Sequence, residues 1–246
     1  LRYPLNAVMR VIEPVLWFAP AILLSRAFVT GGVNAGFASY TGTPDYTAFL
    51  ITGGVVSAYV SAVFWGMGFA LKGEMDLGVL ESNWLMPVPP LVQLIARSLF
   101  SLVHTTVNVA LIAVIVHRTF GFSLGGRLLP AIASMVPLLA ALYGIGLGLA
   151  ALVLRASNAN NFIDIGNFLV TELSGQSFPV AVLPRPLLAI SLALPLTYAY
   201  DSLRGMLLCT ATLLPVALEQ LLLLLLAPAA MIAGWIVFQR VERQCR

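Results

Sequence analysis

The stretch "GEMDLGVLESNWLMPVPP", residues 73–90, decides how the chain is organised. It holds three of the ten acidic residues of the chain, two glycines and three prolines, and it lies between two apolar runs. Each run is long enough to cross a bilayer, which takes about 20 apolar residues. An acidic segment between two such runs predicts a short helix that lies outside the bilayer and connects two transmembrane spans.

The composition around this segment is that of a polytopic, all-α integral membrane protein. Of 246 residues, 60% are hydrophobic and only 9% are charged, whereas a soluble domain carries about 25% charged residues. The net charge of +3 comes from scattered basic residues, and no basic block indicates nucleic-acid binding. A single transmembrane domain over residues 1–246 has material for about six spans of 20 residues.

Apolar runs and polar breaks place these six transmembrane helices after an interfacial N-terminal segment. Residues 177–205 contain four prolines, which interrupt helices, so we expect short broken helices there in place of a continuous span. The spans are predicted at about 14–30, 47–71, 91–116, 128–154, 160–178 and 215–239.

The placement of arginine and lysine predicts the orientation, because cytoplasmic loops carry an excess of these residues. With both termini inside, eight of the 13 basic residues are cytoplasmic and five lie outside. This topology puts the acidic segment in the cytoplasm and the proline-rich segment 177–205 on the external side.

The acidic segment has the periodicity of a helix that lies flat. Leu77, Leu80 and Trp84 recur at i, i+3 and i+7 and so share one face. Glu74 and Glu81 lie seven residues apart, close to one another around the helix. Because cytoplasmic leaflets are negatively charged, exposed acids favour docking onto a protein rather than onto lipid. A solvated loop with incidental periodicity is the alternative.

Two stretches carry motifs that can be compared with known families. They are "GEMDLGVLESNWLMPVPPLVQLIARSLFSLV" (73–103) and "LSGQSFPVAVLPRPLLAISLALPLTYAYDSLRGML" (173–207). The motif residues are Glu74, Gly78, Leu80, Glu81, Leu85 and Pro87 in the first stretch, and Ser174, Gly175, Phe178, Pro179, Leu183, Pro184, Pro195, Thr197, Tyr198, Asp201, Arg204 and Gly205 in the second. Both stretches, in this order, resemble the type-2 ABC transporter permeases, the exporter-type transmembrane subunits of ATP-binding cassette transporters.

This resemblance implies that the acidic segment is a coupling helix, which rests on a separate ATP-binding cassette ATPase subunit. The chain has no G-x-x-x-x-G-K-[ST] phosphate loop, so ATP and Mg²⁺ would bind to that partner, and no catalytic, cofactor or metal site is expected here. A second permease subunit, identical or similar, would complete the transporter in the plasma (inner) membrane. The coupling residues would be Glu74, Leu77, Gly78, Leu80, Glu81, Trp84 and Pro87.

The implied function is ATP-driven export of a hydrophobic or amphipathic substrate (drug, lipid or lipid-linked glycan) by alternating access. An ATP-independent secondary transporter or channel is one alternative, although it would not explain the acidic segment. An intramembrane enzyme is a weaker alternative. Ser174 in "ELSGQ" lacks the G-x-S-G context of an intramembrane serine protease, and the acidic residues are too dispersed for a metal cluster.

The predicted fifth span carries polar residues along one face. Asn160, Asp164, Asn167, Thr171 and Ser174 step by four, three, four and three residues. Ionisable groups within a membrane are functional candidates, and in the resembled family this span lines the central route together with the second. Asp164, Asn167, Thr171 and Ser174 are therefore pathway candidates. Alternatively, Asp164 only caps the cytoplasmic end of the span.

The external segment has two further candidate features. Glu219 lies within reach of Arg204 or Arg185, and we expect an external ion pair that supports the structure. Aromatic side chains at a membrane interface usually anchor the protein there, and this is the expected role of Phe178, Tyr198 and Tyr200.

Overall fold

The computed structural model describes residues 35–42, 45–120, 126–156 and 159–245. The predicted first span, 14–30, and the N-terminal interfacial segment lie outside the described residues. Within these ranges the chain folds into helices and contains no strand. The all-helical prediction is therefore confirmed for the part of the chain that can be described.

Four helices are long and apolar enough to cross a membrane. They match the predicted second, third, fourth and sixth spans to within a few residues at most of their ends. The first of them begins after Asp45, whose side chain accepts a hydrogen bond from the backbone N–H of Ala48 at 2.9 Å and so caps the helix. The four helices are α3 (Tyr46–Asp76), α5 (Pro90–Phe120), α6 (Leu128–Arg155) and α10 (Val216–Cys245).

The predicted fifth span, 160–178, is not one continuous helix. Helix α7 (Ala159–Leu173) has 15 residues and is about 22 Å long, less than the roughly 30 Å of a bilayer core. It stops because Gly175 adopts a φ of +92°. The N–H of Gly175 donates to Glu172 O and that of Gln176 donates to Thr171 O, at 3.0 and 3.2 Å. This is a Schellman motif, which ends a helix.

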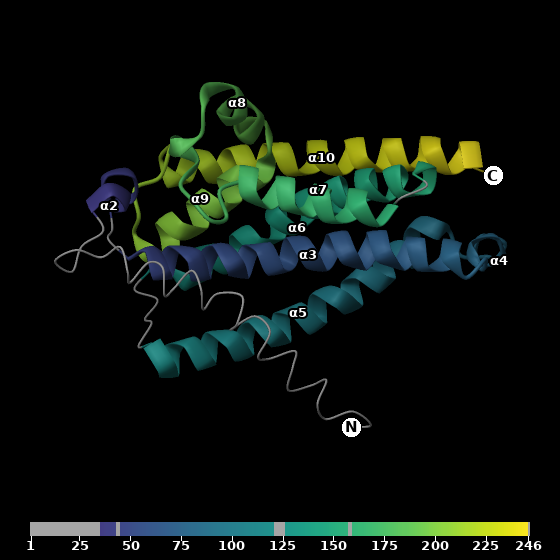
Figure 1. The fold of residues 1–246 in the computed structure, drawn as a ribbon, viewed down its shortest axis with the longest axis horizontal. Coiled ribbons are helices and arrows are strands. Elements are labelled where there is room, and N and C mark those ends of the chain that lie inside the picture. Colours follow the sequence, from purple (N-terminus) through teal and green to yellow (C-terminus); the bar gives the residue numbers. More distant parts are fainter. Residues whose placement is uncertain (1–34, 43–44, 121–125, 157–158, 246) are drawn as a thin grey trace.

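The proline-rich segment forms short helices, as predicted. They are the 3₁₀ turn η1 (Val180–Val182), α8 (Arg185–Ala193) and α9 (Pro195–Leu208). Figure 1 shows α8 and α2 (Ala35–Thr41) at one end of the molecule. The short helix α4 (Leu80–Trp84) and the C-terminal end of α10 lie at the other end. The acidic and proline-rich segments therefore lie at opposite ends, as the predicted topology requires.

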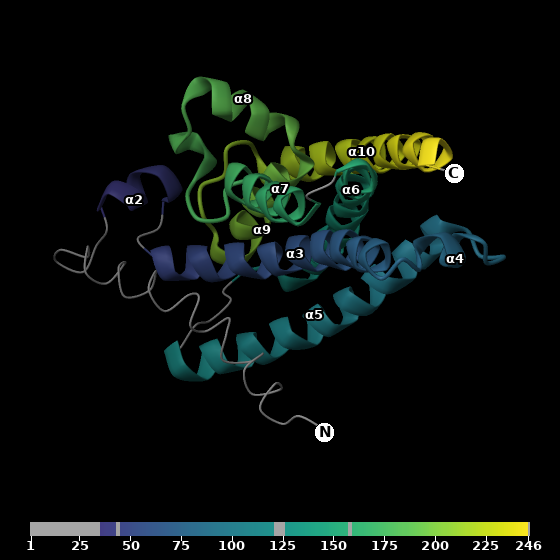
Figure 2. The same ribbon diagram turned by 45° about the vertical axis from the view of Figure 1, so that its right-hand side comes forward.

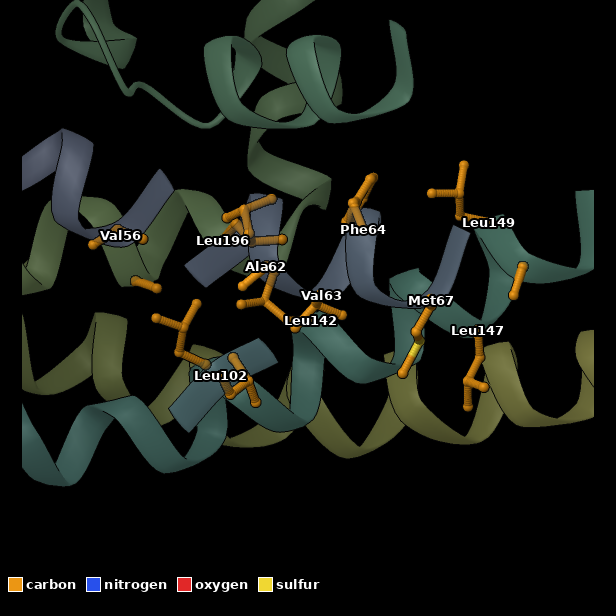
Figure 3. Packing of buried hydrophobic residues seen from close by; sticks show 14 of the residues in the cluster. Val56, Ala62, Val63, Phe64, Met67, Leu102, Leu142, Leu147, Leu149 and Leu196 are labelled. Carbon is orange, nitrogen blue, oxygen red and sulfur yellow. The ribbon is translucent and has the colours of Figure 1, made fainter. Parts of the chain in front are cut away.

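Helix α3 is central and α5 is peripheral, as both ribbon views show (Figures 1 and 2). In the most apolar 18-residue segment of each helix, 67% of α3 is buried inside the bundle, but only 11% of α5 is. Figure 3 shows the core, where Val63 and Met67 of α3 pack beside Leu142 and Leu147 of α6. Burial around α3 therefore organises the bundle, while α5 presents most of its surface outward.

Helices α6 and α10 approach closely through glycines. A Cβ atom on Gly234 would overlap the carbonyl of Gly144, and one on Gly144 would overlap the backbone of Ala230. Small residues allow such contact between membrane helices, where close packing replaces the hydrophobic effect as the main source of association.

Candidate coupling surface and transport pathway

The acidic segment is divided by a helix end. Helix α3 continues to Asp76, and Gly78 then adopts a φ of +68°. The N–H of Gly78 donates to Met75 O at 3.1 Å and that of Val79 donates to Glu74 O at 3.0 Å, which completes a second Schellman motif. Glu74 therefore belongs to the last turn of α3, and the predicted single coupling helix is wrong.

The predicted apolar face is also divided. Leu77 lies in the turn and is 78% exposed, whereas Leu80 and Trp84 of α4 are half-buried and pack against the core. The three residues do not share a face, because the left-handed glycine at position 78 changes the direction of the chain between them. Periodicity along the sequence cannot show this break.

The two predicted acids occupy different environments. Glu81 is exposed in the first turn of α4, but the Glu74 side chain is 11% exposed and forms an ion pair with Arg97 of α5. A carboxylate held between two helices is stabilised by its partner, because burial without a partner would cost several kcal/mol. The prediction that both acids are exposed is wrong for Glu74.

Residues 77–88 form a compact loop that we call the tip. Gln93 of α5 donates from Nε2 to Asn83 O and to Val88 O, both at 3.1 Å. Ser82 Oγ donates to Val79 O at 2.8 Å. Pro90 begins α5, a position that suits proline because the first helical N–H has no partner within the helix. The exposed side chains of the tip include Leu77, Val79, Glu81, Leu85, Met86, Pro87 and Val88.

The polar face of α7 is only partly open. Asp164 is exposed, while the Nδ2 of Asn167 donates to Ser61 Oγ of α3 at 3.1 Å. Thr171 is buried and donates to Asn167 O at 2.8 Å. Ser174 is fully buried, and its Oγ has no hydrogen-bond partner among the described residues. The four candidates share a helix, but in this conformation only Asp164 and part of Asn167 are accessible.

Several external motif residues turn the chain. A Cβ at Gly175 would meet Val180 Cγ2, so the turn requires glycine. Pro179 precedes η1, Pro184 precedes α8, and Pro195 begins α9. These residues shape the link between α7 and α10.

Thr197 and Tyr198 of α9 hold this helix against α8. Thr197 Oγ1 donates to Ser191 O at 2.5 Å, and the Tyr198 hydroxyl donates to Leu192 O at 2.8 Å. Tyr198 and Tyr200 are buried and Phe178 is half-buried. The prediction that the two tyrosines are interface anchors is wrong, because α9 lies inside the bundle beside α6 and α10.

Arg204 connects three elements. Its side chain is 2% exposed, and Nη1 and Nη2 donate to Gly175 O and Gln176 O, both at 2.6 Å. Its Cζ atom lies 3.4 Å from the centroid of the Phe49 ring of α3. Burial lowers the pKa of Arg204 to about 9, so the guanidinium keeps its charge at neutral pH. Arg204 thus ties α9 to the end of α7 and to α3.

Glu219 does not pair with an arginine among the described residues. It is fully buried, and Oε1 accepts a hydrogen bond from the N–H of Leu214 at 3.1 Å. Asp201 Oδ2 accepts from the adjacent N–H of Leu213 at 2.7 Å. The two acids hold consecutive amides of the loop between α9 and α10, and the predicted external ion pair is not formed.

The sequence did not single out the residues that contact the predicted site residues. Arg97, Gln93 and Ser61 are ordinary polar residues of predicted spans. Nothing in their spacing indicates that they bind Glu74, the tip and α7, respectively. Phe49 is one of thirteen phenylalanines in the chain. Only the packing of helices identifies these contacts.

Comparison with known proteins agrees with the apolar membrane helices of the structure. A family model described as "ABC-2 type transporter" matches residues 1–208. No curated protein matched the chain. The family contains transport subunits, works with an ATP-binding cassette partner, and has several apolar membrane helices. The chain is therefore a multi-pass membrane permease subunit that belongs to the ABC-2 type transporter family.

Proposed function

We propose that this chain is the transmembrane subunit of an ATP-driven exporter, and that the partner ATPase moves it through the tip. The observation that carries the proposal is the tip itself. It is a compact loop, joined by hydrogen bonds to both adjoining helices, whose exposed side chains are mainly apolar; Leu77 is 78% exposed and Leu85 is 86% exposed.

The chemistry of the tip suits a protein surface. Exposed apolar side chains grouped at one place usually mark an interaction site, and Glu81 adds a negative charge beside them. Anionic lipid would repel this charge. The complementary surface on the ATPase subunit would be an apolar pocket with a basic residue at its rim.

The connections of the tip provide a route for movement. The Glu74–Arg97 ion pair joins the ends of α3 and α5, and Gln93 holds the tip to α5. A displacement of the tip would therefore tilt both helices together. In the proposed cycle, ATP and Mg²⁺ bind to the partner, its closure displaces the tip, and the bundle alternates between inward-open and outward-open states.

The proposed transport pathway lies on the open side of α7, between this chain and a second, identical or similar, permease subunit. Asp164 and Asn167 are the residues of α7 assigned to it. Thr171 and Ser174 are buried here, and we assign them to the support of this helix end instead. The transporter would lie in the plasma (inner) membrane. The tip and both termini would face the cytoplasm.

The test is to replace Leu77 and Leu85 together with glutamate and to co-purify the ATP-binding subunit. We expect at least a tenfold loss of association, since two desolvated apolar contacts would be replaced by charges. Val182→Glu is the matched control, because Val182 is an exposed apolar residue of η1, which contacts α8 and lies outside the tip. Undiminished association of the double variant, with an unchanged size-exclusion profile, would refute the role of the tip.

A further inference from the structure

We propose that α3 and α7 together form a binding face for a hydrophobic organic cation, in which Trp65 and Phe69 contact the aromatic or aliphatic body and Asp164 balances the charge. We call this surface the aromatic–acid face. The inference rests on the proposed export function, because it names the class of substrate that the pathway on the open side of α7 would accept.

Trp65 and Phe69 lie on the only sector of α3 that the described helices leave open at this level. Gly66 faces Ser98 and Ser101 of α5, Gly68 faces Ile163 of α7, and Gly146 of α6 faces Val63 and Met67. Successive residues turn by about 100° around a helix, so positions 65 and 69 fall between α5 and α7. Accordingly, Trp65 is 47% exposed and Phe69 is 37% exposed. Their ring centroids are 6.4 Å apart, so they act as one aromatic surface.

Asp164 lies on the same side of the α3–α7 pair. On α7, Ile163 and Asn167 face α3, whereas Gly166 faces Leu149 of α6. Because successive residues turn by about 100° around a helix, Asp164 lies beside the contact with α3 and on the side of α7 away from α6. This is the side on which Trp65 is exposed. Phe168 follows one turn later and is 62% exposed.

The register of the two helices brings the acid level with the aromatic pair. Ser61 bonds to Asn167 and Gly68 faces Ile163, so the helices run antiparallel. Between these two contacts, position 164 comes level with residues 65–68. Figures 1 and 2 both show α7 running alongside α3.

The charge of Asp164 is not balanced within the part of the chain that the structure describes. No hydrogen bond or ion pair joins it to a described residue; Lys72 of α3 pairs with Asp76, and Arg155 donates to Gln244. Helix α7 itself contains no basic residue. A carboxylate beside exposed apolar side chains in a membrane protein is costly unless a cation approaches it.

These features select one class of ligand. Aromatic rings attract cations through their π faces and bind apolar bodies by packing, and the carboxylate repels anionic amphiphiles. A second permease copy would not balance the charge by symmetric contact of α7, because the same helix of the partner subunit carries the same carboxylate and no basic residue. A hydrophobic cation satisfies both the rings and the carboxylate.

The experiment measures binding of tetraphenylphosphonium to the permease–ATPase complex in lipid nanodiscs, with neutral triphenylphosphine oxide as the matched probe. Asp164→Asn should weaken binding of the cation about tenfold and leave the neutral probe within twofold, since only the charge contact is removed. Asp164→Glu should restore cation binding. Trp65→Leu combined with Phe69→Leu should weaken both probes.

Glu172→Gln is the control variant, because Glu172 lies on another side of α7 and accepts a hydrogen bond from Ser177 at 3.0 Å. It should leave both probes unchanged. Unchanged cation binding in Asp164→Asn would overturn the inference, and so would an equal loss of both probes, which would show that the carboxylate supports the fold. Either result would leave the export function intact if the Leu77 and Leu85 double variant still loses its ATPase subunit.

Discussion

Arg204 shows how a single buried side chain can organise one end of this bundle. Its two hydrogen bonds satisfy the carbonyls of Gly175 and Gln176 that follow the end of α7. Its guanidinium also packs on Phe49, and a Cβ at Gly53 would overlap it. Removing a buried charge that donates hydrogen bonds leaves its acceptors unsatisfied.

We therefore predict that Arg204→Ala lowers the free energy of unfolding by about 3 kcal/mol, because the carbonyl oxygens of buried Gly175 and half-buried Gln176 lose their donors. Arg204→Lys should give a smaller loss, since an ammonium group lacks the planar fork that reaches both oxygens. Unfolding of the purified protein by titration with a denaturing detergent would measure both effects. Arg185→Ala, at an exposed position of α8, should cause little change; an equal loss there would contradict the assignment.

At the scale of helices, two glycines set the lengths of the elements that matter for function. Gly78 and Gly175 each adopt positive φ two residues beyond a helix end and complete a Schellman motif. Hydrophobicity alone placed the ends of the second and fifth spans at 71 and 178, whereas the helices end at Asp76 and Leu173. Backbone geometry at glycine, and not the loss of apolar residues, decides where these helices stop.

The ion pair between α3 and α5 yields a prediction at this scale. Glu74→Arg and Arg97→Glu should each lower the ATPase activity of the reconstituted permease–ATPase complex, because like charges would separate the two helices beside the tip. The double variant should recover a coupling energy of about 0.5–1 kcal/mol, as expected for a pair that remains partly exposed on the Arg97 side.

The control is Asp76→Asn, which breaks the exposed ion pair with Lys72 on the surface of α3 alone. This variant should leave the ATPase activity unchanged, because the Lys72–Asp76 pair does not connect α3 to a second helix. If the charge-reversed double variant were no better than either single variant, the pair would not be the link between α3 and α5.

On the scale of the whole molecule, the tip and the proline-rich helices lie at opposite ends of the bundle (Figure 1). We predict that they face opposite sides of the membrane. In a Cys209→Ser, Cys245→Ser background, Val182→Cys should react with a membrane-impermeant maleimide on intact cells. Leu85→Cys, although 86% exposed, should react only after permeabilisation. Labelling of Leu85→Cys in intact cells would exclude docking of the tip onto a cytoplasmic ATPase.

The sequence by itself determined the helical membrane class, the positions of four long helices, the break in the proline-rich segment and the likeness to the family. These features depend on local properties: runs of apolar residues, prolines and short motifs. The tertiary structure alone decided which side of each helix is buried. It paired Glu74 with Arg97, set Arg204 against carbonyls 28 and 29 residues away, and left Trp65, Phe69 and Asp164 on one open side.

The physical reason is the nature of the solvent. In water, a polar face shows which side of a helix is exposed, so the pattern of residues predicts the packing. In a bilayer, lipid tails are as apolar as the protein core, and a helix such as α3 is apolar on every side whether it faces lipid or protein. Close contacts between residues distant in sequence then settle the arrangement, and these exist only once the helices have packed.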